Sequence, residues 1–139
     1  MSYTGNAAGA LNSYAEVAVH SGVGAASPHR LIQMLLQAAL DKIATARGYM
    51  AQGIIDKKAQ HLISAVAIVE GLRVSLDMEK GGEISENLCS LYDYMERRLT
   101  EANASNNVAI LDEVINLINP IKEAWDAIPQ DVQDAHSRM

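Results

Sequence analysis

Four histidines, His20, His29, His61 and His136, are the residues of this chain best suited to metal binding or proton transfer. None of them follows a glutamate by three residues, so the Glu-x-x-His motif of a di-iron helical bundle is missing. No two histidines stand four residues apart, which leaves a helical zinc site unsupported. We therefore expect neither a metal ion nor a cofactor.

His61 allows one alternative, histidine phosphotransfer. This chemistry needs an exposed imidazole beside a cation that stabilises the charge of the phosphate. Lys57 and Lys58 lie one turn upstream, but Ile63 and Ser64 follow where small or cationic groups would help. The simpler interpretation is an exposed histidine on a polar helix face, and a phosphotransfer signalling bundle stays open as the alternative function.

The other patterns that could support catalysis or ligand binding are incomplete. Cys89 has no histidine one turn away, which favours an ordinary half-buried thiol over a nucleophile. Gly22-Val23-Gly24 lacks the strand and the lysine of a phosphate-binding loop. The acidic residues around Gly81-Gly82 fit the charges of helix ends better than a calcium loop. We find no catalytic constellation and predict that the protein is not an enzyme.

The composition excludes further classes of protein. The chain has 139 residues, 49% of them apolar, which is enough for one domain with a real core. Its formal net charge of −6 and the lack of a basic cluster disfavour nucleic acids and anionic membranes. A single cysteine excludes an internal disulfide, no basic residue precedes Arg30 to form a signal peptide, and no apolar run could span a membrane. We expect a soluble, cytoplasmic protein.

Helical spacing of the apolar residues predicts an all-α fold, an antiparallel up-down four-helix bundle with a short, mobile N-terminal helix or cap. Residues 1–27 are predicted to be a flexible segment with a short helix at 10–20. Residues 28–128 form the bundle and 129–139 a polar C-terminal tail. The four helices are predicted at 28–50, 56–80, 83–102 and 108–128.

Local signals set the predicted helix ends. Ser27 and Pro28 supply an N-cap and a first helical position, and Gly53 marks a stop. Asp56 is predicted to cap the second helix, and Gly81-Gly82 to end it in a left-handed cap and a tight reversal. Without phenylalanine the core must be aliphatic. Its expected residues include Ile32, Leu36, Ala39, Ile43, Ala46 and Met50, then Leu62, Val66 and Val69, and on the third helix Ile84, Leu88, Leu91, Tyr92, Met95, Leu99 and Ala102.

The first long helix has more apolar surface than a bundle requires. Its polar residues Arg30, Gln33, Gln37 and Asp41 fall within an arc of roughly 80°, which leaves an apolar arc of roughly 240°. An outer bundle helix needs a stripe somewhat over ~100° wide. Another segment of this chain or a partner must cover the surplus.

The surplus predicts a groove that accepts an amphipathic or extended segment of a partner. The candidate groove residues are Leu31, Met34, Ala38, Ile63, Ala67 and Val74. The N-terminal segment, with Leu11 and Tyr14, could cover the same surface as a displaceable lid. Pairing of the surplus surface with a second copy of the chain stays open as another alternative.

Several motifs in the chain are similar to those of the flagellar secretion chaperone FliS family. They are SPHRLIQML at residues 27–35, SLDMEKGGEI at 75–84, Asn87-Leu88, Leu91–Met95 followed by Arg97-Arg98-Leu99, Glu113-Val114 and Glu123-Ala124-Trp125, with Tyr14 matching an N-terminal tyrosine. The resemblance covers roughly residues 11–128. One departure is Leu36-Gln37-Ala38, where the family usually has an aromatic residue followed by Asp-Gly.

This resemblance implies a helical bundle that binds the C-terminal segment of flagellin in the cytoplasm. It implies a chaperone that holds the subunit unpolymerised and delivers it to the flagellar export gate, without catalysis or a cofactor. By the same resemblance, a contact between the segment around Leu11 and Tyr14 and the export gate is a further expectation.

Overall fold

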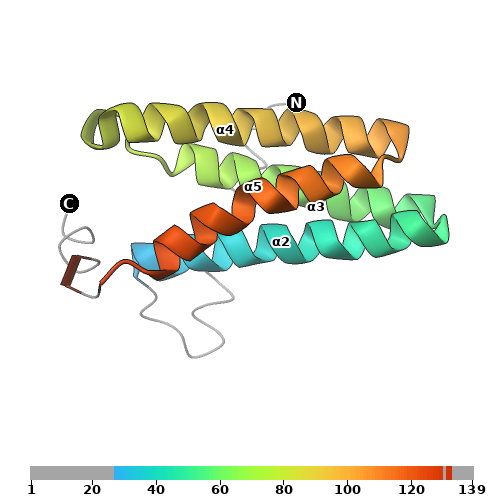
Figure 1. Ribbon diagram of the computed structural model, residues 1–139, viewed down its shortest axis with the longest axis horizontal. Coiled ribbons are helices and arrows are strands. Elements are labelled where there is room, and N and C mark those ends of the chain that lie inside the picture. Colours follow the sequence, from blue (N-terminus) through green and yellow to red (C-terminus); the bar gives the residue numbers. More distant parts are fainter. Residues whose placement is uncertain (1–26, 130, 133–139) are drawn as a thin grey trace.

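A computed structural model describes residues 27–129, 131 and 132 of the chain. The expectations for the short helix at 10–20, for Leu11 and Tyr14 and for the tail beyond residue 132 lie outside these residues. The described part is an all-α four-helix bundle (Figure 1). Its helices are α2 (Pro28–Gln52), α3 (Ile55–Val74), α4 (Met78–Ser105) and α5 (Val108–Asp126).

The four helices are arranged in a ring. Helices α2 and α4 each pack against both α3 and α5. Connections of two or three residues return the chain at each end, which is the short-loop pattern of an up-down bundle. In Figure 1, α5 crosses obliquely between α2 and α4, with α3 behind it. No helix in the described part of the chain is long and apolar enough to cross a membrane.

Both predicted ends of the first helix are confirmed. The side chain of Ser27 accepts a hydrogen bond from the backbone N–H of Arg30 at 3.1 Å, and Pro28 occupies the first helical position. At the other end Gly53 adopts a left-handed conformation with φ of 73° and donates its N–H to the carbonyl of Met50 at 3.2 Å. This conformation is the one that glycine adopts without steric cost.

The predicted boundary between the second and third helices is wrong. Helix α3 ends at Val74, not near residue 80, and α4 begins at Met78. The carboxylate of Asp77 accepts hydrogen bonds from the N–H groups of Glu79 at 3.1 Å and Lys80 at 2.9 Å, and this N-cap starts α4 before the glycines. Gly82, with φ of 52° and ψ of −129°, is a kink inside α4 rather than a reversal.

The start of α3 also differs from the prediction. Ile54 occupies the N-cap position, and no side chain caps the helix there. Asp56 lies inside the first turn, where its negative charge complements the helix dipole without capping the end.

The core is aliphatic, as the composition predicts, except for Tyr92, which is 3% exposed. The expected seam of the first helix is buried from Leu36 to Met50, with Ile32 packed partly buried against it. Ile84 is an exception among the predicted core residues, because it is 72% exposed. It follows the kink at Gly82, near the end of the bundle where α3 has already stopped at Val74.

Candidate functional site

His61 is placed as a structural contact between α2 and α3. Its Nδ1 lies 2.8 Å from the carbonyl oxygen of Lys57, and its ring centre lies 5.4 Å from that of Tyr49 on α2. Lys58 is 2% exposed, and its ammonium donates hydrogen bonds to the Asn103 carbonyl at 2.9 Å and to Asn106 Oδ1 at 2.6 Å. The ammonium group of Lys58 therefore binds the C-terminal end of α4. It is not placed to stabilise a phosphate on His61.

Neither Cys89 nor the acidic residues near Gly81-Gly82 form a catalytic or metal-binding site in the described part of the chain. Cys89 is a free, half-buried thiol, as the sequence suggested. Of the acidic residues near Gly81-Gly82, Asp77 is the N-cap of α4. Within residues 27–129, 131 and 132, no three histidine, cysteine or acidic side chains are grouped as a metal site requires.

The six candidate groove residues lie on two helices that pack against each other. Ile63 is 64% and Val74 is 47% exposed, while Leu31, Met34, Ala38 and Ala67 are partly buried. Tyr49 on α2 faces His61 on α3, and the two helices are antiparallel with the same rise per residue. Counting back along α2 to Met34 and forward along α3 by a similar number of residues therefore brings Met34 near the level of Val74. Ile63 lies about 16 Å from Val74 along α3, at 1.5 Å per residue. The grouping of all six into one groove stays a prediction.

Sequence reasoning missed part of the exposed apolar surface. Met78 is 46% exposed, and Ile84 is the most exposed of the large apolar side chains in the described part of the chain. Together with Val74 these residues flank the connection between α3 and α4. The misplaced helix boundary hid this surface, since Met78 was expected inside one helix and Ile84 on the core face of another.

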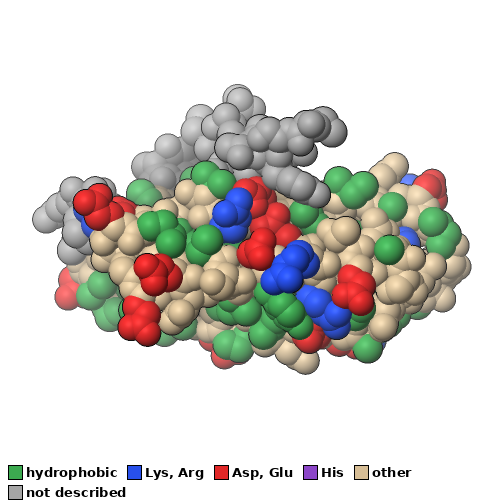
Figure 2. All heavy atoms as spheres, turned by 90° about the horizontal axis from the view of Figure 1, so that it is seen from above, with side chains coloured by type: hydrophobic (Ala, Val, Ile, Leu, Met, Phe, Trp, Pro, Cys, Tyr) green, Lys and Arg blue, Asp and Glu red, His purple; other side chains and the backbone are tan. Residues whose placement is uncertain are grey.

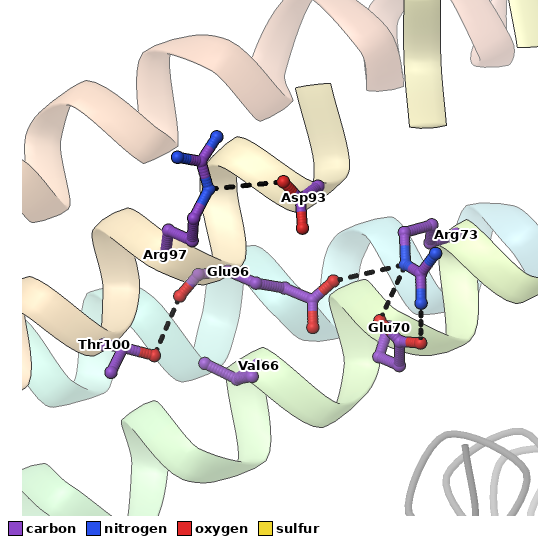
Figure 3. A pocket seen from close by; sticks show the side chains of 7 residues that line it. All are labelled: Val66, Glu70, Arg73, Asp93, Glu96, Arg97 and Thr100. Atoms are coloured by element: carbon purple, nitrogen blue, oxygen red, sulfur yellow. Dashed lines mark hydrogen bonds and ion pairs between the residues drawn. The ribbon is translucent and has the colours of Figure 1, made fainter. Parts of the chain in front are cut away.

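Sequence reasoning also missed a polar site between α3 and α4. An open pocket of about 370 Å³ lies there, and Figure 3 shows its lining: Val66, Glu70, Arg73, Asp93, Glu96, Arg97 and Thr100. Seen from the α4 side, the bundle carries acidic and basic side chains next to one another, with apolar side chains around them (Figure 2). A glutamate at position 70, after an apolar run and three residues before an arginine, was the available signal.

The pocket is lined by three acidic side chains and two arginines, so negative charge is in excess. Arg73 donates two hydrogen bonds to the buried carboxylate of Glu70, one of them from Nε at 2.8 Å. These bonds lower the pKa of Glu70 and raise that of Arg73. Burial, followed by the proximity of Glu70, raises the pKa of Glu96 to about 8.

These features define a class of protein: a helical bundle that presents exposed apolar side chains on its packed helices. A family model described as "Flagellar protein FliS" matches residues 10–132 of the chain. The chain therefore belongs to the FliS family of flagellar secretion chaperones.

Characterised relatives agree with this membership. The chain is 45% identical to the flagellar secretion chaperone FliSB of Pseudomonas aeruginosa over 119 residues, which are 86% of this chain and 94% of the relative. It is 44% identical to FliS of Vibrio cholerae, over 87% of this chain and 89% of the relative. It is 43% identical to FliS of Salmonella typhimurium, over 94% of this chain and 98% of the relative. The family consists of chaperones, and the chain is not an enzyme.

Proposed function

We propose that this chain binds the disordered C-terminal segment of flagellin in an apolar groove. In the cytoplasm, this binding prevents premature polymerisation and aids delivery of the subunit to the flagellar export apparatus. Membership in a family of flagellar secretion chaperones supports the general role. The observation that best supports the groove is the exposure of Ile63. This large apolar side chain is 64% exposed in the middle of α3, whereas the preceding residue, Leu62, is buried.

The energetics favour a partner that folds as it binds. Covering a side chain such as Ile63 or Val74 contributes up to ~1.5–3 kcal/mol. A disordered segment must first offset the loss of conformational entropy on ordering, so several such anchors together give a moderate affinity.

The proposed groove has a length that a short segment can match. The ~16 Å between Ile63 and Val74 correspond to about three helical turns or to about five residues of extended chain. Ala67 lies between them, and Met34 lies near the level of Val74 on α2. A small residue and a flexible thioether leave room for clients of different sequence.

The segment with Leu11 and Tyr14 is part of the proposal as a displaceable lid or as a contact to the export gate. If it competes with the client for the groove, removing residues 1–20 should tighten the binding of a flagellin peptide.

The test is the binding of a flagellin C-terminal peptide to the full chain and to three variants. Met34→Glu and Ile63→Glu each place a charge in the groove, where burial against the client leaves it unpaired, so binding should be lost while helicity is kept. Ile55→Glu is the matched control, because Ile55 is 53% exposed on the same helix but outside the groove.

Unchanged binding in the Met34 and Ile63 variants would rule out this groove. Sedimentation of the unbound chain at several concentrations tests the other use of the surface. A monomer throughout excludes pairing of the groove with a second copy of the chain.

A further inference from the structure

Two carboxyl groups from neighbouring helices converge on one arginine in the pocket between α3 and α4 (Figure 3). The Glu70 side chain is 2% exposed and is bound by Arg73 through two hydrogen bonds. The Nε of Arg73 also lies 3.6 Å from Oε2 of Glu96, whose side chain is 13% exposed. The buried part of the pocket therefore places two carboxyl groups beside one guanidinium.

The other charged groups of the pocket do not restore the balance. Arg97 directs its Nε to Asp93 at 3.2 Å, and its guanidinium lies 5.9 Å from the centre of the Tyr94 ring. Both members of the Arg97–Asp93 pair are more than half exposed. Asp93 adds a further negative charge near Glu96. In the described part of the chain, α3 and α4 supply every charged group that lines the pocket.

The arrangement of two carboxyl groups around one cation favours a retained proton. Two ionised carboxylates beside one shared cation repel each other, and one retained proton replaces that repulsion with a hydrogen bond. Arg73 holds Glu70 in its ionised form, so the proton belongs on Glu96. Burial and Glu70 raise the pKa of Glu96 to about 8, in agreement with this assignment.

We propose that Glu70 and Glu96 form a proton-linked latch between α3 and α4. With its proton in place, Glu96 donates a hydrogen bond to Glu70 and holds the two helices together. When the proton leaves, the two carboxylates repel each other and the α3–α4 contact loosens. This latch is a property of the fold itself and does not depend on the identity of the client.

The sign of the effect on stability follows from proton linkage. Glu96 keeps its proton in the folded chain up to about pH 8, whereas an unfolded glutamate loses it near its ordinary pKa of 4.5. Between these two values the folded state binds more protons than the unfolded state, so the latch makes stability fall as the pH rises. Above pH 8 the effect is complete and constant.

The first experiment follows the side-chain carboxyl carbon of Glu96 in the full wild-type chain by NMR as the pH is raised. The latch predicts a protonated carboxyl at pH 6.5 that titrates near pH 8. A carboxyl already ionised at pH 6.5 would overturn the proposal, and this readout requires no variant.

The second experiment compares melting temperatures of the wild type, Glu96→Gln and Glu86→Gln from pH 5 to pH 9. The glutamine keeps the shape of the protonated side chain and cannot ionise. Between pH 5 and pH 9 the melting temperature of Glu96→Gln should therefore fall by at least ~4 °C less than that of the wild type. Glu86 is exposed on the same helix, and Glu86→Gln should follow the wild type. Equal pH profiles for wild type and Glu96→Gln would contradict the latch.

Discussion

The imidazole of His29 stacks on the indole of Trp125, with ring centres 4.8 Å apart and planes within 8° of each other. The indole Nε1 also donates a hydrogen bond to the backbone carbonyl of His29 at 2.9 Å. These contacts join the first turn of α2 to the last turns of α5, 96 positions apart in the chain. They fix the end of the bundle at which α2 begins.

Trp125 is the single tryptophan of the chain, so its fluorescence reports on this contact. Replacing His29, which is 3% exposed, with alanine uncovers one face of the indole. We expect a red-shifted emission maximum and a loss of about 1–2 kcal/mol in the free energy of unfolding. His61→Ala is the matched control, because it removes a ring from the α2–α3 contact and should leave the emission maximum unchanged. An unshifted maximum in His29→Ala would show that the stacked geometry does not persist in solution.

Lys58 is expected to stabilise the bundle by binding the C-terminal end of α4. It donates to the Asn103 carbonyl and to Asn106, where a positive charge also complements the helix dipole. Lys58→Ala should lower the free energy of unfolding by roughly 2–3 kcal/mol in urea denaturation. The neighbouring Lys57 is exposed, and Lys57→Ala should stay within about 0.5 kcal/mol of the wild type. Equal effects of the two substitutions would contradict the assigned role.

The two aspartates near the ends of α3 should differ in their effect on stability. Asp77 caps α4 through two hydrogen bonds to backbone N–H groups, so Asp77→Ala should cost about 1 kcal/mol in thermal or urea unfolding. Asp56 makes no cap, and Asp56→Ala should cost less than half of that amount. The reverse order would favour the boundary predicted from the sequence.

The features that sequence predicted correctly rest on local signals. Ser27, Pro28 and Gly53 act within one turn of their own positions, and the seam from Leu36 to Met50 follows from helical periodicity alone. The boundary between α3 and α4 was wrong because two local signals compete there. The cap formed by Asp77 prevails, and Gly82 then supplies a kink inside the helix.

The polar site was hidden from the sequence for a different reason. Periodicity indicates which face of a helix is apolar, but not which charged side chains meet across two helices. The burial of Glu70 depends on Arg73 one turn later and on Glu96 from another helix. The chaperone family was predictable because the motifs from Ser27 to Leu35 and from Ser75 to Ile84 are specific in combination. The extent of the groove is not fixed by these motifs and stays a prediction.

The central claim is best tested by calorimetric titration of the full chain with a peptide from a flagellin C-terminus at several temperatures. Burial of an apolar groove together with folding of the peptide predicts a one-to-one complex and a large negative change in heat capacity. The absence of binding heat at every temperature, together with separate elution of chain and peptide in chromatography, would contradict the proposed client.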